Sequence, residues 1–218
     1  MKLGSFISIL FFSITSLNAQ VIFDLPHEDK PELKRFGASF QVGLIFINPV
    51  EVNAYIQKYI KNQIGNGVVF LKHGDENISS AINLNFSPTI KFTNYTLRCM
   101  ADFGIASKSI TVNSKENRFS ILRFSPGLLL DRFFDIDNKK QFFAGAGVQY
   151  QFMSFENTPA NGFGGRIESG FRFRTLEETN YSFFLLLDLA NQETPTAFAP
   201  KIKSIDFSGL GIGARIEF

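Results

Sequence analysis

The stretch that decides the fold is residues 163–174, which read FGGRIESGFRFR. Every charged residue in it has an even number, and every large apolar residue has an odd number. Successive side chains of a β-strand point to opposite faces, so this pattern predicts a strand with one apolar face and one charged face.

The same alternation recurs in seven other segments, and together they predict eight strands in sequence. The other segments cover residues 36–46, 83–92, 95–105, 122–130, 142–152, 181–190 and 209–218. Short turns are expected at Thr93-Asn94, at Asp135 to Lys140 and at Glu177 to Thr179, and polar loops at Asn113 to Asn117 and Glu156 to Gly162. Consecutive strands joined in this way favour an antiparallel up-and-down barrel.

The distribution of charge predicts which face of each strand points outward. The apolar face carries no Asp, Glu, Lys or Arg before Asp206, at the start of the last segment. The other face carries a candidate charge network, made of Lys91, Arg98, Asp102, Arg123, Arg166, Glu168, Arg172, Arg174, Asp188, Arg215 and Glu217. The alternative, a soluble lipocalin-like barrel, would bury a dozen ionisable groups or expose a wide Phe and Leu surface. We therefore expect an all-β fold, an eight-stranded transmembrane barrel with a polar interior.

Aromatic residues give a second indication of a membrane barrel. They stand at the strand ends beside the short turns and share the apolar face, where they would form an interfacial girdle of Phe36, Phe92, Tyr95, Phe134, Phe142, Phe173, Tyr181 and Phe218. With short turns in the periplasm, the longer connections near Lys115, Thr158 and Pro200 would face outside.

The chain divides into three predicted parts. Residues 1–19, with Lys2, an apolar run from Phe6 to Phe12 and a cleavage site after Ala19, resemble a signal peptide. Residues 20–35 are expected to be a flexible periplasmic segment, and residues 36–218 the barrel.

The formal net charge of +2 and the absence of a basic stripe argue against nucleic acid as a partner. One cysteine, Cys99, allows no internal disulfide, and on the apolar face it is expected to be a small lipid-facing residue.

One segment has helical periodicity instead. Val52, Tyr55, Ile56, Tyr59 and Ile60 recur at helical spacing, after Asn48 as N-cap and Pro49 at the first helical position. We expect a helix from Pro49 to about Gln63, ended by Gly65-Asn66-Gly67, in the first extracellular loop. It would dock on the rim of its own barrel, lie at the membrane surface, or present a face to a partner.

The end of the chain carries a family resemblance. The signal peptide, the eight amphipathic strands and the final GIGARIEF at residues 211–218 resemble the small outer-membrane β-barrel superfamily, with its OmpA-like, OmpW-like and PorT-like members. This resemblance covers about residues 36–218. It implies recognition by the barrel-assembly machinery through an assembly signal, namely Leu210, Ile212, Ala214, Ile216 and Phe218. No peptidoglycan-binding domain follows Phe218, unlike the two-domain members, so cell-wall tethering is not expected.

The sequence offers little for catalysis or for cofactors. Its two histidines, His27 and His73, lie in the lead-in and in the loop after the helix, where a solvated histidine is the expected account, although His73 is near Asp75 and Ser79. A lone cysteine and two distant histidines do not make a zinc site, and no cofactor is expected. Gly145-Ala146-Gly147 and Gly162-Phe163-Gly164-Gly165 open no helix, which excludes phosphate loops and favours relief of crowding inside a narrow barrel.

The predicted function is a non-enzymatic outer-membrane protein with a structural, envelope-integrity or surface-interaction role, present as a monomer with both termini in the periplasm. Its partners would be outer-membrane lipids, the assembly machinery and an unidentified envelope protein. The charge network would fill the narrow interior as salt bridges. Three alternatives stay open: a narrow channel or pocket for small anions, a PorT-like component of a secretion apparatus, and a lipid-modifying enzyme.

Overall fold

The computed structural model describes residues 33–65, 77–112, 115–137, 139–175, 179–195 and 202–218, and residues 34–218 form one compact unit. The predicted leader, His27 and His73 lie outside these residues. The elements in chain order are β1 (Leu33–Ile47), α2 (Val50–Gly65), β2 (Ser80–Phe92), β3 (Tyr95–Val112), β4 (Lys115–Asp135), β5 (Lys140–Phe155), β6 (Thr158–Arg174), β7 (Asn180–Leu189), β8 (Asn191–Glu193), β9 (Ser204–Asp206) and β10 (Gly209–Glu217).

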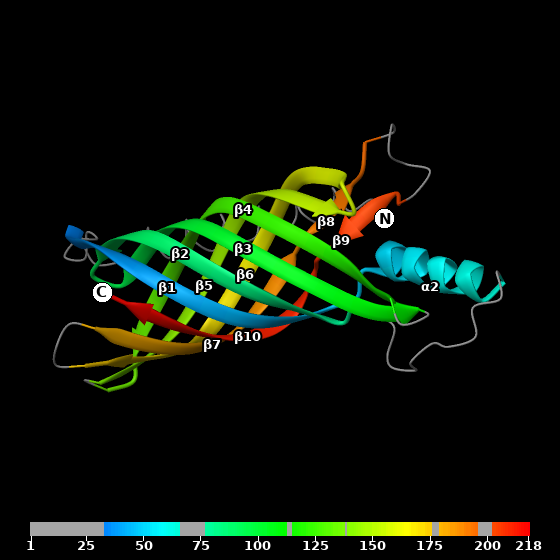
Figure 1. Cartoon of the computed structure of the whole chain (residues 1–218). Coiled ribbons are helices and arrows are strands. Elements are labelled where there is room, and N and C mark those ends of the chain that lie inside the picture. Colours follow the sequence, from blue (N-terminus) through cyan, green and yellow to red (C-terminus); the bar gives the residue numbers. More distant parts are fainter. Residues whose placement is uncertain (1–32, 66–76, 113–114, 138, 176–178, 196–201) are drawn as a thin grey trace, which may run out of the picture. The chain divides into compact units, whose positions relative to one another are not determined.

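Eight of these strands close into an antiparallel up-and-down barrel in the order β1-β10-β7-β6-β5-β4-β3-β2. Each pairs with its sequence neighbours in the barrel, and β10 closes the ring on β1 through the register Gln41 to Arg215 and Leu44 to Ile212. This confirms the predicted fold class. Figure 1 shows α2 and the β8–β9 ribbon at one end of the barrel, the helix end, and the C-terminus at the other, the C-terminal end.

The two faces of the barrel strands follow the predicted alternation. In β2, for example, Leu84 and Phe86 are exposed on the outer wall, whereas Asn83, Asn85 and Ser87 are buried inside. Cys99 is exposed, as its position on the apolar face predicts. A wall whose outer side is apolar and whose inner side is polar is the reverse of a soluble barrel.

The helix docks on the rim of its own barrel, the first of the three alternatives. Val52, Ile56 and Ile60 are buried in an apolar cluster with residues from β1, β3, β4, β5 and β9. At its edge, the Tyr59 ring meets Phe119 with centroids 5.3 Å apart. We call the members of this cluster that lie under α2 at the helix end the apolar plug, namely Ile47, Ile110, Phe119, Phe155 and Ile205.

The helix begins one residue later than predicted, at Val50, and ends at the predicted breaker, Gly65. The carbonyl of Pro49 accepts the first helical hydrogen bond, from the Asn53 amide at 2.8 Å, so Pro49 occupies the capping position assigned to Asn48. The Asn53 side chain in turn accepts from the backbone N–H of Ile78 and donates to its carbonyl. This pair of hydrogen bonds fastens α2 to the segment that leads into β2.

Two predicted loops are mostly strand. Residues 113–117 and 156–162 are polar and were therefore expected to be loops, but β3 extends to Val112, β4 starts at Lys115, and β6 starts at Thr158. Glu156 and Asn157 make a two-residue turn with φ of 47° and 63°, as tight hairpins require. Polar residues also form strands where a hairpin extends beyond an apolar wall, so polarity alone did not mark the loop.

Several charged residues depart from the predicted faces, including Glu116 and Arg118, which are exposed on the outward face of β4 near the helix end. Asp206 belongs to the short β8–β9 ribbon, which was expected to be loop, and not to the last barrel strand. Arg132 and Lys140 continue the outward face of β4 and β5 at the C-terminal end, so this face is not free of charge there. The guanidinium of Arg132 lies over the Tyr95 and Phe134 rings, at 5.6 and 5.0 Å from their centroids, which accommodates its charge at the wall.

The described parts of the turns at the C-terminal end match the prediction, while Asn138, Glu177 and Glu178 lie outside the described residues. In the turn between β4 and β5, the Asp137 carboxylate accepts hydrogen bonds from the backbone N–H groups of Lys139 and Lys140 at 2.7 and 2.8 Å. Those bonds, chiefly the one from Lys139, hold the pKa of Asp137 below its ordinary value. Aromatic rings of the predicted girdle adjoin these turns, and Phe134 and Phe142 lie 6.0 Å apart.

The closed ring of strands predicts heat-dependent migration on a detergent gel. Every barrel strand is hydrogen bonded on both sides, so the ladder has no free edge from which to unravel. We expect the unheated protein to run as a compact species and the boiled protein to run more slowly. A closed barrel would be contradicted if both lanes showed equal mobility and the unheated protein gave no β-sheet signal in circular dichroism.

Candidate functional site: the charged interior

The eleven residues of the predicted charge network occupy two different environments. Ten are buried, among them Arg98, Arg166 and Arg215, three of the largest fully buried side chains. Arg174 is the exception, because its side chain is 42% exposed at the C-terminal rim, where it pairs with Asp135 at 3.1 Å. The prediction that Arg174 belongs to the internal network is therefore wrong. Arg174 stands on the inward face of β6, but β6 ends at this residue, so its side chain reaches solvent at the rim.

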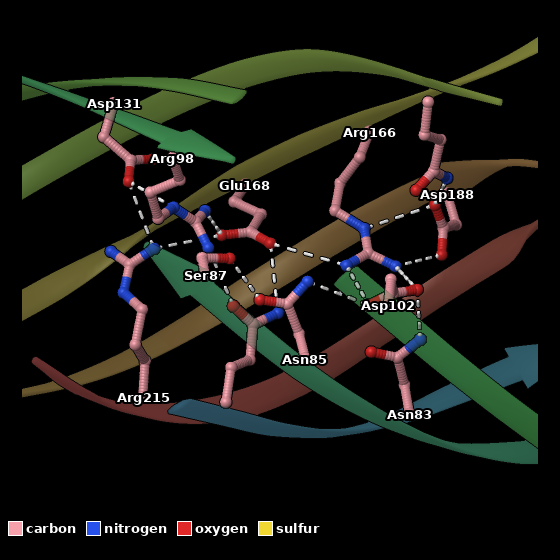
Figure 2. Close-up of polar contacts among 12 residues, drawn as sticks. Asn83, Asn85, Ser87, Arg98, Asp102, Asp131, Arg166, Glu168, Asp188 and Arg215 are labelled. Atoms are coloured by element: carbon pink, nitrogen blue, oxygen red, sulfur yellow. Dashed lines mark hydrogen bonds and ion pairs between the residues drawn. The ribbon is translucent and has the colours of Figure 1, made fainter. Parts of the chain in front are cut away.

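The group nearer the helix end joins two arginines to two aspartates. Arg166 contacts Asp102 at 2.9 Å and Asp188 at 2.6 Å, and Arg123 contacts the same two carboxylates at 2.6 and 2.8 Å. Figure 2 shows Arg166 between Asp102 and Asp188. Asn83 donates a further hydrogen bond to Asp102 at 2.8 Å. Two cations and two anions thus neutralise one another with the bridging geometry that buried charges require.

The group nearer the C-terminal end is built around Glu168. This carboxylate accepts from the Arg98 guanidinium and from Arg215 at 3.3 Å, and both arginines also contact Asp131, at 2.8 and 3.1 Å. Gln41 of β1 donates to Glu168 at 3.1 Å and accepts from Arg98 at 3.0 Å. In Figure 2, Arg98, Glu168, Asp131 and Arg215 gather beside one another, away from Asp188. A 3.9 Å contact from Arg166 to Glu168 links the two groups.

A third set closes the series toward the C-terminal end. Glu217 lies between Arg215 at 3.0 Å and Arg172 at 2.8 Å, and Lys91 donates to the backbone carbonyl of Phe218 at 2.8 Å. Aromatic rings cover several guanidinium planes along the interior, with Phe207, Phe143 and Phe133 at 4.4 to 4.5 Å from Arg123, Arg215 and Arg172. These contacts give the weakly hydrated guanidinium faces a favourable surface.

Asp131 is the member of the network that sequence reasoning missed. It is fully buried and bridges two arginines from β3 and β10. The alternation was followed only to Leu130, yet Arg123, Leu129 and Asp131 share the inward face of β4. Extending the strand by one residue would have found it.

The corrected network is nearly balanced in charge. The prediction counted seven cations against four acids, but without Arg174 and with Asp131 the described interior holds six against five. Because the interior no longer has a large excess of positive charge, there is less reason to expect a conduit for anions. A packed, paired interior suits the width of eight strands, which leaves room for little more than side chains.

The described residues offer no metal site. They contain no group of three His, Cys, Asp or Glu that could hold a metal ion, and neither histidine is among them. No helix in the described part of the chain is both long and apolar enough to cross a membrane. Of the predicted assembly signal, Leu210, Ile212 and Phe218 are exposed on the outer wall, and Ala214 and Ile216 are half-buried.

The network predicts a large penalty for removing one of its bridging arginines. Arg166→Met leaves two buried aspartates with one arginine fewer, and we expect the free energy of unfolding to fall by about 3–5 kcal/mol. The exposed pair is the matched control, since Arg174→Gln should cost only about 0–1 kcal/mol. Urea unfolding in detergent micelles measures both. Equal destabilisation by the two variants would contradict the internal network.

Comparison with known proteins supports the fold alone. No family model matches the chain, and no curated protein matches it. Among solved structures it is similar to Neisserial surface protein A, with a TM-score of 0.51 and 9% sequence identity, covering 84% of this chain and 96% of that one. This likeness agrees with the closed eight-stranded barrel of the chain.

Proposed function

We propose that this protein is a closed, non-enzymatic barrel of the bacterial outer membrane that serves the envelope surface. The observation that carries the proposal is the inverted wall. Large apolar side chains such as Phe86, Leu128 and Leu185 are exposed outside, while charged side chains are buried inside. Soluble proteins rarely expose contiguous apolar surface of this extent, and lipid is the solvent that suits it.

The aromatic girdle supports an orientation across the bilayer. Its rings gather at the end of the barrel that carries Phe218 and the short turns, where aromatic side chains favour a membrane interface. We propose that this end faces the periplasm and that α2 and the β8–β9 ribbon face outside. The outward residues of β10 that end at Phe218 would then serve the assembly machinery as its signal.

A surface role is favoured over transport. The apolar plug fills the helix end, and the ion-paired residues fill the interior below it. An ion would have to break paired charges and displace apolar side chains in order to pass. The similarity to a Neisserial surface protein also supports a surface role, in which the helix end would be the part available to a partner.

Reversing the polarity of the outer wall tests membrane insertion. Leu128 is 50% exposed in the middle of β4, opposite Cys99 and Val148. Leu128→Arg would place a charge in hydrocarbon at about 2–4 kcal/mol, so the yield of folded barrel in lipid vesicles should fall sharply. Glu156→Arg, in the exposed turn between β5 and β6, is the control and should insert normally. Normal insertion of both variants would contradict a lipid-facing position for Leu128.

The closed interior predicts silence in planar bilayers. We expect the purified protein to give no reproducible single-channel steps in concentrated potassium chloride. An Arg98→Ser, Arg215→Ser double variant, which removes two of the largest internal side chains, should conduct if it still shows the heat-dependent gel shift. Regular steps from the unaltered protein would overturn the surface role in favour of a channel.

A further inference from the structure

A cavity of about 430 Å³ opens at the C-terminal end of the barrel, below the ion-paired interior. Every ionisable side chain that lines it is a cation, namely Lys91, Arg172 and Arg174. Around them stand hydroxyl groups from three strand ends and turns, those of Thr93, Thr96 and Thr175. The volume lies in the range of small-molecule pockets.

The three cations are held in place from behind. Glu217 contacts Arg172 at 2.8 Å and the Phe218 carbonyl accepts from Lys91, but neither acceptor lines the cavity. Phe133 lies under the Arg172 guanidinium and fixes its plane. Positive groups anchored by partners outside a cavity focus a positive potential into it.

Arg174 stands at the entrance and can exchange its partner. Its ion pair with Asp135 is exposed, with side-chain accessibilities of 42% and 62%, and exposed pairs are weak. An incoming anion could therefore recruit Arg174 at little cost. The deeper Arg172 supplies the fixed positive charge.

The number of donors distinguishes between the anions that could bind. A carboxylate offers two oxygens, whereas a phosphate monoester offers three strong acceptor oxygens and nearly two negative charges. Three cations and the hydroxyl groups of Thr93 and Thr96 exceed what one carboxylate can accept. The Thr175 hydroxyl is left out of this count, because it donates to the Thr179 carbonyl. Guanidinium groups also match phosphate geometry well.

We propose that this cavity is a binding site for a phosphate group, carried either by a small soluble phosphate ester or by a lipid headgroup at the neighbouring membrane interface. Phe92, a residue of the aromatic girdle, also lines the cavity. The cavity therefore adjoins the proposed membrane interface, where a lipid headgroup could enter, as well as the solvent, from which a soluble ester could enter. The site would give the barrel a ligand at the end opposite to α2. Binding of a soluble phosphate does not depend on the membrane placement proposed above, because the cavity belongs to the folded chain, whereas the headgroup source rests on that placement.

The test is a titration of the detergent-solubilised barrel with inorganic phosphate, followed by broadening of the phosphorus NMR line in a detergent without phosphate. We expect saturable binding that weakens about tenfold in Lys91→Gln and in Arg174→Gln, the loss of one charge-assisted hydrogen bond. The matched control is Lys139→Gln, which removes the same charge from an exposed turn at the same end but outside the cavity. It should change affinity less than twofold. The heat-dependent gel shift checks that each variant is folded.

Two competition experiments identify the source of the phosphate. Displacement by glycerol 3-phosphate and by short-chain phosphatidic acid at similar concentrations would assign a soluble ester, and displacement by the lipid at tenfold lower concentration would assign a headgroup. Each result supports the site. No saturable broadening, an equal loss in Lys139→Gln, or displacement by succinate at concentrations that match phosphate would overturn it. Failure there leaves the insertion experiment unaffected, so the two proposals fail separately.

Discussion

The rest of the structure depends on the mutual neutralisation of charges inside a closed ring of strands. An ionised side chain loses its hydration when it is enclosed, and only a well-placed opposite charge offsets that loss. Arg166 therefore needs both Asp102 and Asp188, and these carboxylates come from β3 and β7, on different sides of the ring. Asp188 is the register partner of Arg166 on the adjacent strand, whereas Asp102 lies across the ring. The pairs that cross the ring specify which strands face one another, and because the interior charges pair with one another, the outer wall is free to be apolar.

Small residues create the room that this packing needs. A Cβ atom at Gly145 would collide with the carboxylate of Asp131, the residue that bridges Arg98 and Arg215. At Gly104 it would lie 2.9 Å from the Phe207 ring, which covers the Arg123 guanidinium. Gly145, one of the glycines that suggested relief of crowding from the sequence, is thus the counterpart of a charged side chain, and Gly104 is the counterpart of an aromatic ring. At these two positions the glycine makes room for a member of the charge network or for the ring that covers one.

The sequence predicted the eight strands, both faces and the helix because a two-residue period survives wherever one face meets a uniform environment. It failed where that uniformity ends. Arg174 has the inward position of Arg172, but at the rim the inward face is solvated. Residues 115–117 are polar and yet belong to β4, where the β3–β4 hairpin extends beyond the apolar wall. The sequence also could not predict which charged residues pair. Alternation indicates that Glu168 points inward, but not that Arg98 and Arg215 donate to it there.

The two ends of the barrel are closed by different chemistry, and the difference bears on function. At the helix end, α2 lays Val52, Ile56 and Ile60 over an apolar plug, which excludes water and polar ligands. At the C-terminal end the interior opens into a cavity whose ionisable groups are all cations. Side chains that only sealed the barrel could be apolar at both ends, as the plug demonstrates. Lys91 and Arg172, although buried and held by the Phe218 carbonyl and Glu217, line this open volume with cationic groups, and an anionic ligand at that end is the simplest physical use for them.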